Sequence, residues 1–201
     1  MYKGWNMLYN SLAARNAATR KGEKPMKKMI ALLALLCVAL LPFASLAETA
    51  TAITWEEVAP IIEASEISGD FYAMEDLNLA IWLPNGLSEV EITEEDAAKG
   101  LLSVLTDDEG SCALIISCVN QKGITLEELL DAAVKDGMKE PELVNINGLD
   151  ALSYTDAENN AGCIALVYTD GDVVIFSFTP IDAEGADVIF TLLMASLMPL
   201  E

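Results

Sequence analysis

The sequence predicts an α+β fold in which a mainly antiparallel sheet of about six to seven strands is flanked by helices. Short apolar runs, several of them alternating, are bounded by turn-forming residues and therefore predict strands. Asn147-Gly148 and Asp170-Gly171 each separate two apolar runs, which is typical of hairpins and so of antiparallel neighbours. Residues 48–201 are long enough to form a single domain with one core.

Three segments have the features of helices: 54–66, 125–136 and 182–197. The middle one is the clearest, because Thr125 lies three residues before Glu128 in a capping-box spacing and Gly137 follows as a stop signal. Thr54 and Glu57 repeat that spacing in the first helix, although Pro60 could interrupt it.

The predicted strands are 77–83, 100–106, 111–119, 143–146, 151–155, 163–169 and 173–179. Segment 111–119 is apolar on both of its faces, which is typical of a strand that is covered on both sides. We therefore expect layers above and below the sheet. Trp82 lies on the opposite face of the first strand from Ile81. Because both faces of the sheet are expected to be covered, we expect Trp82 to be a core residue rather than a contact for a partner.

Residues 26–47 have the three parts of a secretory signal peptide. Lys27 and Lys28 precede an uncharged apolar stretch, and small residues occupy Ser45 and Ala47 before the expected cleavage point. We expect export, and so an extracellular or cell-surface location. The alternative is an uncleaved single-pass anchor near the N-terminus. Residues 1–25 are interpreted as a non-native or disordered extension, with translation starting at Met26.

The residues after position 47 are very acidic, because four lysines remain there against 31 Asp and Glu, a net charge of about −27. Such a domain would be repelled by phosphates, which excludes nucleic acid as a partner and disfavours anionic lipid surfaces. We expect no membrane insertion once the signal has been cleaved. Strong net charge also keeps a domain dispersed, so we expect a monomer.

The order of elements and several short motifs resemble a known superfamily. The motifs are Gly69-Asp70-Phe71-Tyr72, Trp82-Leu83-Pro84, Ile146-Asn147-Gly148-Leu149, a Tyr168…Phe176-Ser177-Phe178 hairpin and Ser196-Leu197. Together they look like the Mog1/PsbP-like superfamily, and they are also similar to small secreted Firmicutes proteins of unknown function. The resemblance implies an α/β/α sandwich around an antiparallel sheet. Its members do unrelated things, so it implies no site residue here.

The chain contains no histidine, which removes Ser-His-Asp and Cys-His catalysis as well as the usual zinc sites. It also has no GxSxG elbow, P-loop or GxGxxG motif. We therefore expect a secreted, non-enzymatic binding or accessory module, without a cofactor, whose partner is a protein, a peptide or a component of the cell envelope.

Two alternatives remain open. Clustered carboxylates favour calcium, and the candidate ligands are Asp107, Asp108, Glu109, Asp170 and Asp172, although none matches the spacing of an EF-hand. A carboxylate-dependent hydrolase would need two positioned carboxyl groups, and with 31 acidic residues after position 47 no particular pair stands out.

The three cysteines of this region are Cys112, Cys118 and Cys163. In a single strand Cys112 and Cys118 would lie about 20 Å apart, too far for a disulfide. Cys163 could reach one of them only from an adjacent strand. We expect all three to act as buried small hydrophobic residues.

Overall fold

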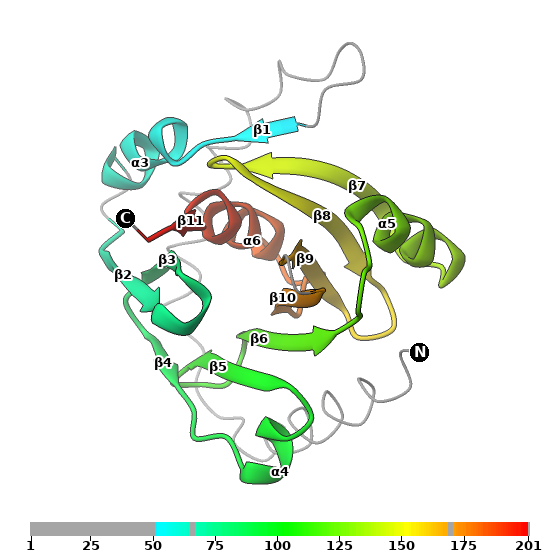
Figure 1. Ribbon diagram of the computed structural model, residues 1–201. Coiled ribbons are helices and arrows are strands. Elements are labelled where there is room, and N and C mark those ends of the chain that lie inside the picture. Colours follow the sequence, from blue (N-terminus) through cyan, green and yellow to red (C-terminus); the bar gives the residue numbers. More distant parts are fainter. Residues whose placement is uncertain (1–50, 65–66, 169–170, 201) are drawn as a thin grey trace.

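The computed structural model describes residues 51–64, 67–168 and 171–200, which form two β-sheets with helices around them (Figure 1). The predictions for residues 1–25 and for the signal peptide lie outside the described residues. Eight strands make up the larger sheet, in this order: β1 (Thr51–Ile53), β7 (Lys139–Ile146), β8 (Leu149–Asp156), β9 (Ala161–Val167), β10 (Asp172–Thr179), β6 (Ala113–Asn120), β5 (Leu101–Asp107) and β4 (Leu87–Glu89).

A second sheet has three strands, in the order β11 (Met198–Pro199), β3 (Leu79–Pro84) and β2 (Gly69–Met74). The helices are α3 (Trp55–Ala64), α4 (Glu94–Ala97), α5 (Leu126–Lys135) and α6 (Ala186–Ala195), with a 3-10 turn, η4 (Glu75–Leu77), before β3. Among the described strands, all neighbours pair antiparallel except β1 and β7. The predicted α+β class is confirmed. No described helix is both long and apolar enough to span a bilayer.

Both faces of the larger sheet are covered, as the apolar pattern of segment 111–119 predicts. The sheet curves around α6, which packs with the second sheet against its inner face through Ile81, Phe176 and Leu193 (Figure 1). On the outer face, α5 buries Leu129 and Ala133 against β8, β9 and β10. Helix α3 covers the other side of α6, where it encloses Trp82, so the prediction that Trp82 is a core residue is confirmed.

The structure differs from the sequence prediction at the edges of the sheets. The larger sheet has eight strands because β1 and β4, three residues each, are added by pairing with β7 and β5. The predicted strand 77–83 begins at Leu79, because Asn78 adopts a left-handed conformation (φ 52°) that ends η4. That strand lies in the second sheet, which the sequence did not reveal.

The last helix begins at Ala186 rather than at residue 182, because Gly185 precedes it with a positive φ of 78°. Asp182 is held outside the helix, where its backbone N–H and its carboxylate bond to the side chain of Asn160. Helix α3 continues through Pro60, which the sequence marked as a possible interruption.

Candidate functional site

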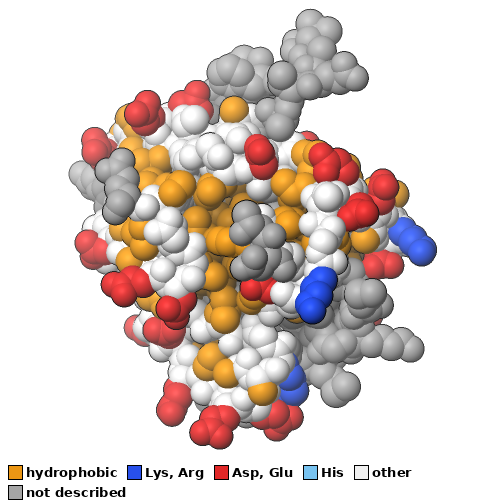
Figure 2. Space-filling model, viewed as in Figure 1, with side chains coloured by type: hydrophobic (Ala, Val, Ile, Leu, Met, Phe, Trp, Pro, Cys, Tyr) orange, Lys and Arg blue, Asp and Glu red, His pale blue; other side chains and the backbone are white. Residues whose placement is uncertain are grey.

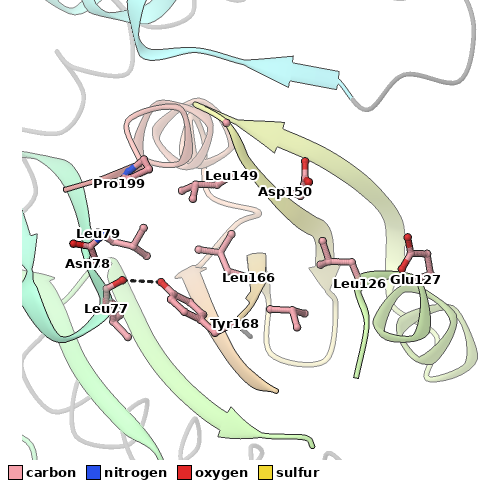
Figure 3. Close-up of a pocket in the computed structure, with 12 residues that line it drawn as sticks. Leu77, Asn78, Leu79, Leu126, Glu127, Leu149, Asp150, Leu166, Tyr168 and Pro199 are labelled. Atoms are coloured by element: carbon pink, nitrogen blue, oxygen red, sulfur yellow. Dashed lines mark hydrogen bonds between the residues drawn. The ribbon is translucent and has the colours of Figure 1, made fainter. Parts of the chain in front are cut away.

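An open groove of about 550 Å³ lies where the second sheet meets the larger one. It is lined by residues from five segments: 77–79, 126–127, 148–150, 166–168 and 199. The labelled side chains reach it from η4, β3 and β11 at one end and from the start of α5 at the other (Figure 3). Its volume falls in the range of about 300–1,000 Å³ that is common for ligand sites.

The floor of the groove is apolar because it continues the core. Leu79 and Leu166 belong to the main hydrophobic cluster and are 2% and 4% exposed. Leu77, Leu126 and Leu149 are half-buried and stand around that floor. Because the floor belongs to that cluster and the groove lies above it, the groove is a place where the core is left partly uncovered.

Tyr168, directly after β9, is bonded across the groove to the η4 turn that precedes β3. Its hydroxyl donates a hydrogen bond of 2.9 Å to the carbonyl oxygen of Leu77 (Figure 3). Burial raises the pKa of the Tyr168 phenol above its ordinary value, and the nearby Cys118 thiol adds to the effect. The phenol is therefore neutral at physiological pH and serves as a hydrogen-bond donor that fixes the spacing of the groove walls.

The charged residues that line the groove are Glu127 and Asp150, and both are exposed. An Asp150 carboxylate oxygen accepts a hydrogen bond of 2.7 Å from the Asn145 side chain. Figure 2 shows hydrophobic side chains in the middle of this face, many acidic side chains around them and few lysines. Within the described part of the chain, the ion pairs are those of Lys99 with Glu95 and Asp96, away from the groove lining.

A junction centred on Asn147 lies directly before the groove segment 148–150. The Asn147 Nδ2 donates to the carbonyl oxygens of Ala195 and Leu197, each at 2.8 Å, and Oδ1 accepts from the Trp55 backbone N–H at 2.7 Å. Asn147 adopts φ 48°, a conformation that asparagine tolerates better than most residues. One side chain thus ties the β7–β8 turn, the end of α6 and the start of α3 together.

The predicted calcium ligands are not brought to one place by the fold. Asp107 directly follows Thr106, which pairs with Ala113 at the start of β6, whereas Asp172 pairs with Asn120 at the end of β6. At 3.4 Å per residue, these two ends of β6 are about 24 Å apart. The Asp107 carboxylate accepts bonds from the backbone N–H of Ser111 and of Cys112.

The Asp172 carboxylate accepts a bond from Asn120. Asp108 and Glu109 lie exposed in the turn after Asp107, and Asp170 lies outside the described residues. Among the residues that the structure describes, no three His, Cys, Asp or Glu side chains come together as metal ligands. Calcium binding by these residues stays a prediction.

The three cysteines among the described residues are free thiols, and of these Cys163 is buried as expected, whereas Cys112 and Cys118 are only half-buried. Cys163 is opposite Ser177 in β10, which in turn is opposite Ile115 in β6, so its strand is not adjacent to the one that carries Cys118. Burial raises the pKa of the Cys163 thiol to about 12. Burial also raises the pKa of the Cys112 thiol to about 12, helped by the negative charge of Asp107. At physiological pH these two groups are protonated and unreactive.

No pattern in the sequence predicts the groove. Its lining comes from five separated segments, and residues such as Leu166 and Tyr168 were predicted only as parts of strands. Asn147 was predicted as a hairpin residue, and nothing in its neighbours signals the bonds to α6. One available signal was the motif itself, since the Asn-Gly step was already part of the superfamily resemblance.

No protein-family model matches this sequence, and no curated protein sequence matches it either. Solved structures do resemble it. The solution structure of cyanobacterial PsbP (CyanoP) from Synechocystis sp. PCC 6803 has a TM-score of 0.50 and 12% identity, covering 79% of this chain and 99% of its own.

A crystal structure from Bacteroides thetaiotaomicron VPI-5482 has a TM-score of 0.44 and 14% identity, covering 66% of this chain and 49% of its own. The Saccharomyces cerevisiae Ran-binding protein Mog1p has a TM-score of 0.38 and 9% identity, covering 68% of this chain and 97% of its own. The likeness to PsbP shows a Mog1/PsbP-like fold, as the sequence resemblance implied, and at 12% identity it shows the fold alone.

Proposed function

We propose that this chain is an exported, non-enzymatic binding module and that the groove between its two sheets is the binding surface. The observation that carries the proposal is the groove itself, an open site of about 550 Å³ with an apolar floor that is already formed in the folded chain. Covering such apolar surface with a ligand removes it from water, which is favourable for binding.

The chemistry of the groove supports binding over catalysis. Its polar side chains are Asn78, Glu127, Asp150 and Tyr168. The Tyr168 hydroxyl is bonded to a backbone carbonyl and Asp150 to an asparagine, so neither is bonded to a nucleophile that it could activate. The chain has no histidine to act as a base near neutral pH. Nothing among the described residues favours the calcium or the hydrolase alternative.

The predicted signal peptide and the acidity of residues 48–201 support a particular class of partner. The partner we propose is a protein, a peptide or an envelope component outside the cytoplasm, and nucleic acid is excluded by charge. The module is proposed to act as a monomer, because its strong negative charge opposes self-association.

Saturable binding that depends on the groove tests this proposal. Protein purified after expression of the full chain would be titrated onto intact cells of the culture that produces it, together with the variants Leu149→Trp and Val134→Trp. Leu149 lines the groove and is half-buried, so tryptophan there fills it. Val134 is 59% exposed and outside the lining, so it receives the same side chain without blocking the groove.

The native protein and Val134→Trp should bind with the same saturation curve, and Leu149→Trp should lose the saturable part. Circular dichroism and thermal unfolding establish that each variant is folded. If Leu149→Trp is folded and binds like the native protein, or if no saturable binding is found with any of them, the groove is not the binding surface.

A further inference from the structure

We infer that the groove binds a cationic, amphipathic peptide segment, in which apolar side chains lie next to Lys or Arg. This inference rests on the proposed function and adds the chemistry of the ligand. Three features of the groove carry it: its elongated shape, its apolar floor and the sign of the charges on its rim.

The shape favours a chain over a compact molecule. Figure 3 shows the lining side chains spread in a row, from Leu77 and Leu79 at one end, past Leu166 and Leu149, to Leu126 at the other. The groove is open to solvent. An extended segment can place successive side chains along such a row, whereas a compact ligand would cover only part of it.

The floor selects apolar side chains. Leu79 and Leu166 are at the bottom of the groove and already nearly dry, so a polar side chain placed on them would lose its water without gaining a partner. The half-buried Leu77, Leu126 and Leu149 would be covered further by an apolar side chain, which is the favourable direction.

The rim selects positive charge. Both charged side chains of the lining, Glu127 and Asp150, are acidic and exposed. No described lysine forms an ion pair with either of them, whereas Lys99 is paired with Glu95 and Asp96. The net charge of about −27 after residue 47 adds a long-range field that attracts cations to the whole surface and repels anionic ligands.

Because that field attracts any cation, the test must separate the groove from general charge. The probes are three short synthetic peptides with alternating residues: leucine–lysine, serine–lysine and leucine–glutamate. Each is titrated calorimetrically into protein purified after expression of the full chain, at physiological and at low salt. Leucine–lysine should bind saturably with one site, serine–lysine should bind only weakly and only at low salt, and leucine–glutamate should not bind.

Two double variants with the same change in net charge then locate the site. Glu127→Gln with Asp150→Asn neutralises the rim, and glutamine and asparagine keep the acceptor oxygens. Glu91→Gln with Asp108→Asn neutralises two exposed carboxylates beside β4 and β5, at the other end of the larger sheet. Four strand spacings of about 4.8 Å separate β5 from β8, which carries Asp150; this path along the sheet is about 19 Å, against a screening length of about 8 Å at physiological salt.

The rim variant should weaken leucine–lysine binding by roughly three- to tenfold, the size expected for two exposed ion pairs, and the distant variant should leave it unchanged. Leu149→Trp should abolish it. Pro199→Trp, at an exposed position of the lining, serves as a second blocking variant if Leu149→Trp does not fold.

Equal losses from the two double variants, or binding that survives a folded blocking variant, would overturn the inference, because the peptide would then be held by general charge or elsewhere. If cell-surface binding requires the groove but the leucine–lysine peptide does not bind, the proposed function stands and the inference about the ligand is wrong. If neither groove-dependent binding to cells nor binding of the leucine–lysine peptide is found, both the proposed function and the inference about the ligand are wrong.

Discussion

Replacing Asn147 with alanine removes the three hydrogen bonds that join the β7–β8 turn to α6 and α3. The lost bonds are those to the Trp55 N–H and to the carbonyl oxygens of Ala195 and Leu197, at 2.7, 2.8 and 2.8 Å. Ala195 and Leu197 are fully buried residues, so their carbonyl groups are poorly placed to find water instead. At about 1 kcal/mol for each bond, the side chain contributes about 3 kcal/mol to the free energy of unfolding.

The substitution has a second cost, because alanine tolerates the left-handed conformation of residue 147 less well than asparagine, by about 1 kcal/mol. Asn78 provides the matched control. Its φ is 52°, close to the 48° of Asn147, and no side-chain hydrogen bond of Asn78 is found within the described residues. Asn78→Ala should therefore lose about 1 kcal/mol, and Asn147→Ala about 4 kcal/mol.

Urea unfolding followed by circular dichroism measures both values. With a slope of about 2 kcal/mol per molar urea, the 3 kcal/mol difference corresponds to midpoints about 1.5 M apart. Asn147→Asp adds a test of the donors, because aspartate keeps the acceptor for Trp55 but turns a negative charge toward two carbonyl oxygens. It should be at least as destabilising as alanine at neutral pH. If Asn147→Ala and Asn78→Ala unfold within about 0.5 kcal/mol of each other, the junction is not holding these segments together.

Three further outcomes follow from buried contacts, each measured as the free energy of unfolding in urea. Ser196→Ala should cost about 2 kcal/mol, because the fully buried hydroxyl accepts from the Trp82 N–H at 2.9 Å, and a conserved value of the urea slope would show that the fold is intact. Gly100→Ala should lower the free energy of unfolding by more than about 3 kcal/mol, because at φ 93° its Cβ would lie 2.1 Å from a backbone carbonyl oxygen. Gly86 is the control: it has φ 108° and open space around it, so Gly86→Ala should lose only the stability that comes from the unfavourable backbone conformation. Equal losses in the two variants would show that the contact at Gly100 does not matter. The Cys163 thiol has its pKa raised to about 12 in the folded chain, against an ordinary 9.0. The contribution of the protonated thiol to the free energy of unfolding is therefore complete below pH 9 and is lost between about pH 9 and 12. The difference in the free energy of unfolding between the native protein and Cys163→Ala should stay constant below pH 9 and change by about 1.4 kcal/mol per pH unit between about pH 9 and 12.

The parts of the fold that the sequence predicted are those in which a local pattern and the tertiary contacts agree. The segment 125–136 is one example: Thr125 and Glu128 form the capping box and the apolar stripe of α5 packs on the sheet. The hairpin at Asn147-Gly148 is another, because a two-residue turn fixes the pairing of its strands. For such elements, the physical cause lies within a few residues of the chain.

The parts that escaped prediction depend on partners far away in the sequence. Strand β2 has no alternating apolar pattern, since Asp70, Phe71 and Ala73 are exposed, and it exists because it pairs with β3. The three-residue β1 and β4 likewise exist through pairing. The groove is the extreme case, since each of its walls comes from a different segment and no local pattern describes the space between them.

The Asn147 junction and the groove are consecutive in the chain, and this couples the stability of one to the shape of the other. Residues 148–150 leave the junction and line the groove directly, while α6, whose C-terminal carbonyls Asn147 holds, leads into β11 and so to Pro199, which also lines the groove. A loosened junction would therefore let two parts of the groove lining move at once. Asn147→Ala, at temperatures where it remains folded, should weaken groove-dependent binding even though Asn147 does not line the groove. Ser196 does not line the groove either, and its side chain fixes α6 to β3 without touching the turn, so Ser196→Ala should reduce stability with less effect on binding.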